Sequence, residues 1–232
     1  MNGTLYGVGI GPGDPRYLTL RAAEVLRSAD VIFTVISAHA EDSTSRRVVE
    51  YLKPRGEIRL QVFSMSRNPK TREEQVQANA NAIIAELRAG RDCAFACLGD
   101  AMTYSTFGYV LDIIRAAIPD LTLEIVPGVT SFAALAARAE TVLAENTQEL
   151  RVIPSFRSDM AERLDFPRGS TTILLKTYRS RAALLERLER EENVDILYGD
   201  QLGMDGQILL TDMDAIRERP ETYLSLIMVK KR

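Results

Sequence analysis

Three short turns hold the residues that are best suited to binding a small molecule. The first occupies residues 7–15 and reads GVGIGPGDP, the second occupies residues 98–108, and the third occupies residues 126–132. Each turn follows an apolar run with the composition of a β-strand. Because ligands of open α/β sheets bind outside the carboxyl ends of the strands, we expect the three turns to converge on one crevice.

The first turn disfavours a nucleotide phosphate site. A dinucleotide fingerprint needs a glycine three residues after its second glycine, but Pro12 stands three residues after Gly9 and Asp14 three after Gly11. Proline cannot donate the backbone N–H groups that a phosphate requires. No G-x-x-x-x-G-K-[ST] run occurs either. The turn instead offers a stiff, close approach of backbone to a ligand, although a tight connection without any ligand remains the alternative.

The other two turns add a carboxylate and hydroxyl groups. Asp100 follows Gly99 directly after a predicted strand, and Ser105 or Thr106 is suited to capping the helix that comes next. The third turn, VPGVTSF, ends another strand and opens another helix. Each turn is a weak signal by itself, whereas the three together indicate a ligand crevice.

Composition excludes several other kinds of site. The chain of 232 residues is 46% hydrophobic and 26% charged, as globular proteins are, and its net charge of −3 disfavours general nucleic-acid binding. His39 is the only histidine, which disfavours a Ser-His-Asp triad or a His-rich metal centre. Cys93 and Cys97 lie on one predicted strand about 13 Å apart, too far for a disulfide or for joint metal ligation. We expect them to be buried structural thiols.

We expect neither a membrane-spanning helix nor a signal peptide. No apolar run of about 20 residues occurs. The first residues, MNGTLY, have neither a basic start nor a long apolar core. A cytoplasmic protein without membrane or nucleic-acid partners is therefore expected.

Alternating apolar and amphipathic segments predict two α/β domains, at residues 1–140 and 141–232. A polar stretch over residues 139–148 suggests the linker, and the apolar run at the carboxyl end suggests a central strand. Strands are predicted at residues 4–10, 31–34, 58–62, 94–98, 122–126, 150–154, 171–176, 195–198, 207–211 and 223–229. Helices are predicted at residues 19–28, 43–51, 71–89, 104–117, 131–139, 159–164, 181–190 and 212–218.

The first turn and the residues after it resemble the start of the tetrapyrrole (corrin/porphyrin) methyltransferase family. The resemblance rests on GxGPGDP, YLTLRA and ADVI in the first 32 residues, and on GD and PGVTS at the next two signature positions. YSTF at residues 104–107 and TSFAALAAR at residues 130–138 are most similar to the branch that methylates C-20 of precorrin-2 or cobalt-factor II. The sequence departs from the family at Ala101, where proline is usual, and at Asp200–Gln201, where Glu-Arg is usual.

The resemblance implies two α/β domains with a trough between them that binds S-adenosylmethionine (SAM), which becomes S-adenosylhomocysteine (SAH). It also implies a tetrapyrrole substrate and a homodimer. The implied cofactor-binding residues are Pro12, Gly99, Asp100, Thr103, Thr130, Ser131, Lys176, Leu202, Gly203, Leu224 and Ser225.

The reaction that this resemblance implies requires mainly that the methyl group and the substrate carbon be aligned. The sulfonium methyl group is already electrophilic, and holding it against an electron-rich carbon contributes about 7–11 kcal/mol. Asp100 and Tyr104 are the candidate bases for removing the C-20 proton, and no metal ligands are expected. We expect Lys176 to contact a substrate carboxylate. Other candidate carboxylate contacts are Arg46, Arg47, Arg67, Lys70, Arg72, Arg157, Arg179 and Arg181.

Several alternatives stay open at this point. The chain could methylate another tetrapyrrole position, or it could bind tetrapyrroles without catalysis. Whether the substrate carries cobalt is also open. The YSTF turn speaks against the diphthine synthase and ribosomal-RNA methyltransferase branches, and the broken fingerprint speaks against a nucleotide-dependent oxidoreductase.

Overall fold

The computed structural model describes residues 1–37, 42–63, 68–154 and 158–232. They form two compact units, Met1–Thr130 and Ser131–Arg232. The division precedes the expected boundary at residue 140 because helix α5 (Ser131–Arg138) packs on the second sheet. Its Leu135 is fully buried beside Ile173 and Met228 of that sheet.

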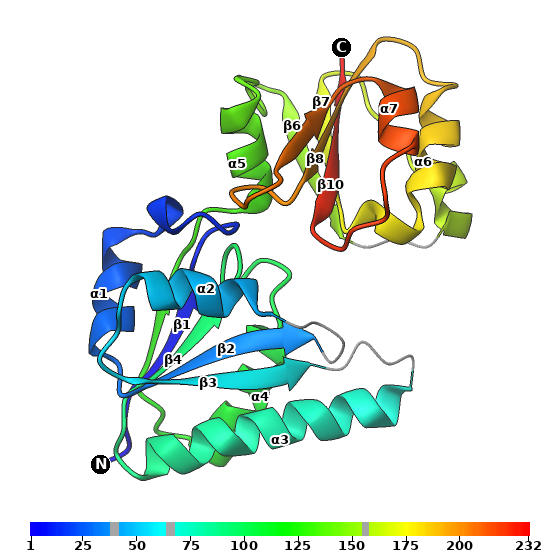
Figure 1. Ribbon diagram of the computed structural model, residues 1–232. Coiled ribbons are helices and arrows are strands. Elements are labelled where there is room, and N and C mark those ends of the chain that lie inside the picture. The colour runs from blue at the N-terminus through cyan, green and yellow to red at the C-terminus, as the bar shows by residue number, and fades with distance from the viewer. Residues whose placement is uncertain (38–41, 64–67, 155–157) are drawn as a thin grey trace. The chain divides into compact units, whose positions relative to one another are not determined.

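The first unit contains a parallel five-stranded sheet (Figure 1). The order is β3-β2-β4-β1-β5, so the strand that precedes the first turn lies between the strands that precede the other two. The bounds are β1 Leu5–Gly9, β2 Val31–Ser37, β3 Glu57–Phe63, β4 Cys93–Cys97 and β5 Leu123–Val126.

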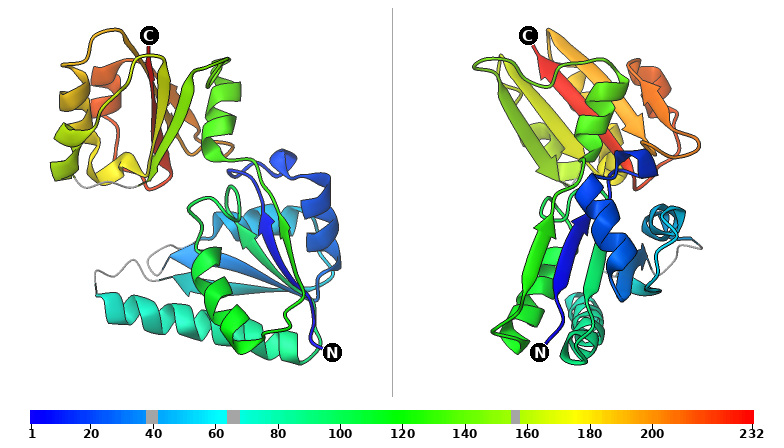
Figure 2. Two further views of the ribbon diagram at one scale, coloured as in Figure 1. Left: turned by 180° about the vertical axis from the view of Figure 1, so that it is seen from behind. Right: turned by 90° about the vertical axis from the view of Figure 1, so that its left-hand side faces the viewer.

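Helices cover both faces of this first sheet (Figure 2). Apolar side chains of α1 (Leu20–Ser28) and α2 (Thr44–Tyr51) form one core layer, and those of α3 (Pro69–Arg88) and α4 (Phe107–Ala117) form the other. The helices begin at capping residues: side chains of Thr19, Ser43 and Asn68 accept backbone hydrogen bonds in the first turns of α1, α2 and α3. A short 3₁₀ helix, Pro15–Tyr17, follows the first turn.

The two cysteines are buried and free, as expected. Strand β4, with the sequence CAFAC, is buried along its whole length because helices cover both faces. Burial raises the pKa of the Cys93 and Cys97 thiols to about 12. Within the described ranges, no group of three His, Cys, Asp or Glu residues could hold a metal ion, and His39 lies outside them.

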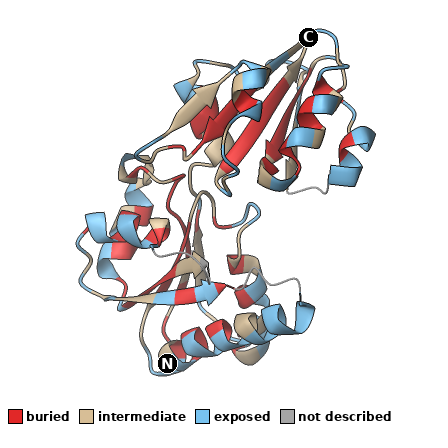
Figure 3. Ribbon diagram, turned by 45° about the vertical axis from the view of Figure 1, so that its right-hand side comes forward, coloured by how far each residue is buried: buried red, intermediate tan, exposed pale blue. Residues whose placement is uncertain are grey.

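The second unit contains a mixed sheet with the order β6-β7-β10-β8-β9. Strands β6 and β7 are parallel, whereas the other neighbours are antiparallel. The apolar run at the carboxyl end forms the central strand, as predicted, and its first five residues are buried (Figure 3). The bounds are β6 Glu149–Pro154, β7 Ser170–Leu175, β8 Val194–Asp200, β9 Ile208–Leu210 and β10 Ser225–Lys231.

Helix α5 covers one face of the second sheet, and α6 (Arg181–Leu188) and α7 (Met213–Arg217) cover the other. Short 3₁₀ helices occupy Ser158–Arg163 and Thr177–Arg179. The expected fold of two α/β domains is therefore confirmed. In the part of the chain that the structure describes, no helix is long and apolar enough to cross a membrane.

Candidate functional site

The three glycine-bearing turns meet in the first unit, as the sequence predicts. Gly11 and Gly99 exchange two backbone hydrogen bonds, with N···O distances of 3.1 and 2.7 Å. The third turn joins them because the Gly128 N–H donates to Asp100 Oδ2 at 3.0 Å. The carboxyl ends of β1, β4 and β5 thus form one continuous backbone surface.

Glycine is required at two of these positions by the closeness of the chains. A Cβ atom added at Gly9 would lie 2.5 Å from the Gly128 nitrogen. A Cβ atom added at Gly128 would lie 2.2 Å from the carbonyl oxygen of Gly99. Real Cβ contacts are never this short, so a side chain at either position would separate the turns.

Asp100 links the second and third turns through both carboxylate oxygens. Its Oδ1 accepts hydrogen bonds from the Met102 N–H and the Thr103 hydroxyl, each at 2.9 Å, while Oδ2 accepts the bond from Gly128. Burial acts to raise the pKa of Asp100, but the bonds from Gly128, Met102 and Thr103 together lower it below its ordinary value. A carboxylate stabilised in its ionised form is a weak general base.

Tyr104 follows this turn in a strained backbone conformation. Its φ of +51° lies in the left-handed region, which non-glycine residues rarely adopt, and the residue is 48% exposed. The Ser105 hydroxyl accepts a hydrogen bond from the Phe107 N–H at 3.1 Å, so Ser105 rather than Thr106 caps helix α4. Pro12 is buried in the first turn, whereas Thr130 and Ser131 are partly buried at the end of the third.

Five predicted contacts of the second unit lie at one end of its sheet: Lys176, Leu202, Gly203, Leu224 and Ser225. The Lys176 N–H donates to the Ser225 carbonyl at 3.0 Å, which joins the end of β7 to the start of β10. The Gln201 N–H donates to the Leu224 carbonyl at 3.2 Å, which joins the end of β8 to the same segment. Leu202 is buried beside them, and the Gly203 N–H donates to the side chain of Gln207.

This end of the sheet also carries left-handed backbone positions. Lys176, Gln201 and Gly203 have φ values of +57°, +48° and +73°. Each non-glycine residue held there costs about 1–3 kcal/mol, so the surrounding contacts must impose the conformation. The Lys176 ammonium lies 5.3 Å from the centre of the Tyr223 ring, a cation–π contact.

Arg181 is not available as a substrate contact, contrary to the sequence-based expectation. It is buried, and its guanidinium donates to the backbone carbonyls of Arg219 and Pro220. Other candidate cations form surface pairs: Arg46 with Glu50, Arg47 with Asp42, and Lys70 with Glu74. Arg67 and Arg157 lie outside the described residues.

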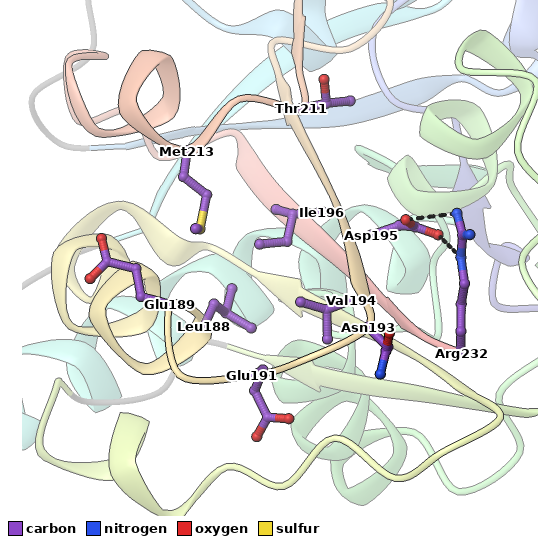
Figure 4. A pocket seen from close by; sticks show the side chains of 10 residues that line it. All are labelled: Leu188, Glu189, Glu191, Asn193, Val194, Asp195, Ile196, Thr211, Met213 and Arg232. Atoms are coloured by element: carbon purple, nitrogen blue, oxygen red, sulfur yellow. Dashed lines mark hydrogen bonds and ion pairs between the residues drawn. The ribbon is translucent and has the colours of Figure 1, made fainter.

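A separate pocket lies at the start of β8 and beside the end of α6, and none of the predicted site residues lines it (Figure 4). Its floor is apolar, and its acidic groups are paired. Asp195 forms a two-bond pair with Arg232 at 2.8 and 2.9 Å. Glu189 pairs with Arg217, and Glu191 pairs with Arg187 and Lys231. No unpaired charge on these residues points to a ligand there.

Sequence reasoning missed a buried polar residue that lies beside the predicted contacts of the second unit. Asp200 was noted only as a departure from the family, although it is fully buried and accepts a hydrogen bond from Thr222. No local signal predicts its burial, because aspartates are almost never fully buried unless they are paired.

Comparison with known proteins identifies the relatives of this architecture. The sequence profile of the tetrapyrrole (corrin/porphyrin) methylases matches residues 4–215. The chain belongs to this family. It is 34% identical to the cobalt-precorrin-2 C(20)-methyltransferase of Salmonella typhimurium, over 100% of this chain and 98% of the relative.

Solved structures of tetrapyrrole methylases share the fold. The uroporphyrin-III-C-methyltransferase of Thermus thermophilus superposes with a TM-score of 0.71 at 25% identity, covering 99% of this chain and 94% of that one. A Thermus thermophilus structure of the same activity, described as complexed with S-adenyl homocysteine, gives a TM-score of 0.63 at 20% identity, covering 98% and 97%.

Proposed function

We propose that this methylase transfers the methyl group of SAM to C-20 of precorrin-2 or its cobalt-bearing counterpart, in cobalamin biosynthesis. The observation that carries the proposal is the full-length similarity to the Salmonella typhimurium enzyme. The convergence of the three turns supports the SAM part, because it supplies the backbone surface that a compact donor requires.

The residues of the first unit fit the donor. Gly9, Gly99 and Gly128 bring backbone close together without side chains in the way. The ionised Asp100 carboxylate suits the ammonium group of the methionine part of SAM, while Pro12, Thr103 and Thr130 border the same turns. In this assignment most contacts come from backbone atoms, which accounts for a glycine- and proline-rich motif.

A second set of proposed contacts belongs to the other unit. Ser131, Lys176, Leu202, Gly203, Leu224 and Ser225 are the candidates, with the last five at one end of the sheet. The left-handed backbone there holds these residues in a set geometry, with the N–H groups of Lys176, Gln201 and Gly203 bonded within the unit. Such preorganised residues recognise the adenosine part of a ligand without loss of conformational freedom.

In this reaction the protein mainly has to hold the reactants in the correct orientation. SAM, when bound, supplies an electrophilic methyl group. The protein residues orient the donor against the substrate carbon and exclude water. For removal of the C-20 proton, Asp100 and Tyr104 both stay candidates; the hydrogen bonds that hold Asp100 in its ionised form also lower its basicity.

The test is a product assay. Purified protein is incubated with SAM labelled with ¹³C in the methyl group and, in separate reactions, with precorrin-2 and cobalt-factor II. NMR then locates the new methyl group. Label at C-20 supports the proposal, and the faster substrate shows whether cobalt is preferred. Label at another carbon would establish a different methylase branch, and no transfer to either substrate would favour a non-catalytic tetrapyrrole-binding protein.

Two finer proposals remain: that the chain is a homodimer, which the family resemblance implies, and that it is cytoplasmic. Analytical ultracentrifugation tests the first by measuring the mass of the particle in solution. Fractionation of the producing cells tests the second. A monomer, or material in a membrane or exported fraction, would contradict the corresponding proposal.

A further inference from the structure

The segment at residues 219–224 connects α7 to β10 and is fastened by two buried charged side chains. The first is Arg181, at the start of α6, which is only 5% exposed. Its guanidinium donates to the carbonyl oxygen of Arg219 in a close contact and to that of Pro220 at 3.1 Å. It also donates to the Tyr198 hydroxyl at 3.4 Å, so the guanidinium spans α6, β8 and the segment.

The second is Asp200, the last residue of β8, which is fully buried. Its Oδ1 accepts a hydrogen bond from the Thr222 hydroxyl at 2.7 Å. Its Oδ2 lies 4.0 Å from the Arg219 guanidinium, and neither Oδ2 nor Arg219 Nε has a hydrogen-bond partner among the described residues. Asp200 therefore contacts the segment in its middle, while Arg181 contacts its beginning.

The end of the segment is continuous with the proposed SAM contacts. Ser225 Oγ donates to the Thr222 carbonyl at 2.8 Å, so the residue held by Asp200 also orients Ser225. The Leu224 and Ser225 carbonyls accept bonds from Gln201 and Lys176. Displacement of Thr222 would therefore move the backbone that carries these groups.

Stability alone does not account for this arrangement. Burying an arginine and an aspartate costs free energy, and well-packed apolar residues are often as stable or more so. Where such groups occur, fixing one arrangement of the chain is a recognised role for them. Here both groups act on one six-residue segment that leads directly into the candidate site.

We propose that Arg181 and Asp200 are positioning residues, which fix residues 219–224 and thereby hold Leu224 and Ser225 in the geometry that binds SAM. The inference rests on the proposed function, because it assumes that these two residues contact the donor. It assigns no contact with the donor to Arg181 or Asp200 themselves.

Binding of SAH to three full-length variants tests the proposal. Arg181→Met removes the guanidinium that donates hydrogen bonds but keeps an apolar side chain of similar length. Thr222→Val removes the hydroxyl that donates a hydrogen bond to Asp200. Arg181→Lys keeps a positive charge at the buried position. Calorimetry should show SAH binding about tenfold weaker for the first two, the size of one lost hydrogen bond to a charged group. Arg181→Lys should recover part of the loss. The KM for SAM should rise with the dissociation constant, while kcat at saturating SAM stays near the wild-type value.

Arg187→Met is the matched control. Arg187 lies on the same helix, its side chain is 17% exposed, and it pairs with Glu191 at 2.5 Å and packs over Phe166. Its loss should lower the melting temperature and leave SAH binding unchanged. Wild-type affinity in folded Arg181→Met and Thr222→Val, or equal weakening by Arg187→Met, would overturn the inference. If Arg181→Met does not fold, Thr222→Val decides, because its side chain lies on a partly exposed connection.

The proposed function and this inference can fail separately. Wild-type protein that binds SAH but methylates another carbon would end the C-20 assignment, while a selective loss in the variants would still support the positioning role. Wild-type protein that binds no SAH would overturn both.

Discussion

At the scale of single residues, Asp100 joins two turns and is also a proposed contact of the methyl donor. Its carboxylate accepts three hydrogen bonds from two different turns. These bonds favour the ionised form, which is also the form that attracts an ammonium group. The sequence places an acidic residue at this edge, but only the structure shows that its oxygens are directed at backbone and hydroxyl donors.

Asp100→Asn should destabilise the first unit and weaken SAH binding. Both carboxylate oxygens accept hydrogen bonds, so the NH₂ group of asparagine would face a donor in place of one of them. The expected loss at pH 7 is about 1 kcal/mol, kept small by solvent at this partly exposed position. Because the folded-state pKa of Asp100 is lowered, the wild-type advantage should be complete above the unfolded pKa of about 3.9 and disappear as pH falls through the lower folded value.

Urea unfolding at pH 7 and at pH 3 measures this advantage. Asp112→Asn, an exposed aspartate on α4, is the control and should change neither stability nor binding. An Asp100→Asn deficit that stayed constant with pH would show that the charge is not the cause.

Lys176→Ala tests the substrate contact. If the ammonium binds a tetrapyrrole carboxylate, the KM for the tetrapyrrole should rise about tenfold, and that for SAM should change much less. Lys53→Ala is the control, since Lys53 also has a left-handed backbone (φ +49°) and is exposed. Equal losses for both substrates in Lys176→Ala would refute the carboxylate assignment.

At the scale of elements, the turns were easier to predict than their mutual contacts. Apolar runs followed by glycine, proline and aspartate mark where strands end, because backbone preferences are local. The contact of Gly9 with Gly128 depends on β1 lying beside β5, and the sequence contains no local signal for that pairing. The inward direction of Arg181 was missed for the same reason, since a helix-start arginine is usually exposed.

Gly128→Ala tests the closeness of the turns. The added methyl group would displace the Gly99 carbonyl and should cost about 1–3 kcal/mol, with SAH binding weakened by more than about tenfold. Gly108→Ala is the control, because a Cβ atom there meets no neighbouring atom within 4 Å, and alanine favours the helix by about 1 kcal/mol. Unfolding curves and calorimetry of both variants give the comparison, and normal binding by Gly128→Ala would contradict the proposed site.

At the scale of the whole molecule, each unit has its own sheet and its own buried layers. The sequence predicts the two α/β units because the spacing of apolar residues distinguishes strands from helices and so gives their order along the chain. By contacts α5 belongs to the second unit, and its sequence pattern shows an amphipathic helix but not the sheet on which that helix packs. Polarity at residues 139–148 marks a connection inside the second unit.

Buried thiols give a measure of how ligand binding stabilises the first unit. Native protein should react with a thiol reagent at Cys93 and Cys97 only when the sheet opens, because both are buried and their pKa values are raised to about 12. SAH at about 100 times its dissociation constant should slow this reaction about a hundredfold, equal to about 2.7 kcal/mol. Mass spectrometry over time measures the labelling. Unchanged labelling rates with bound SAH would show that SAH binding does not stabilise the first unit against opening.

The two backbone hydrogen bonds between Gly11 and Gly99 join the first and second turns into one rigid structure. Because each turn holds the other in place, the backbone bend that contains Ala101 is fixed by contacts outside itself. Ala101 is itself only 1% exposed and packs in the core of the first unit, so a larger side chain there would have to displace its neighbours.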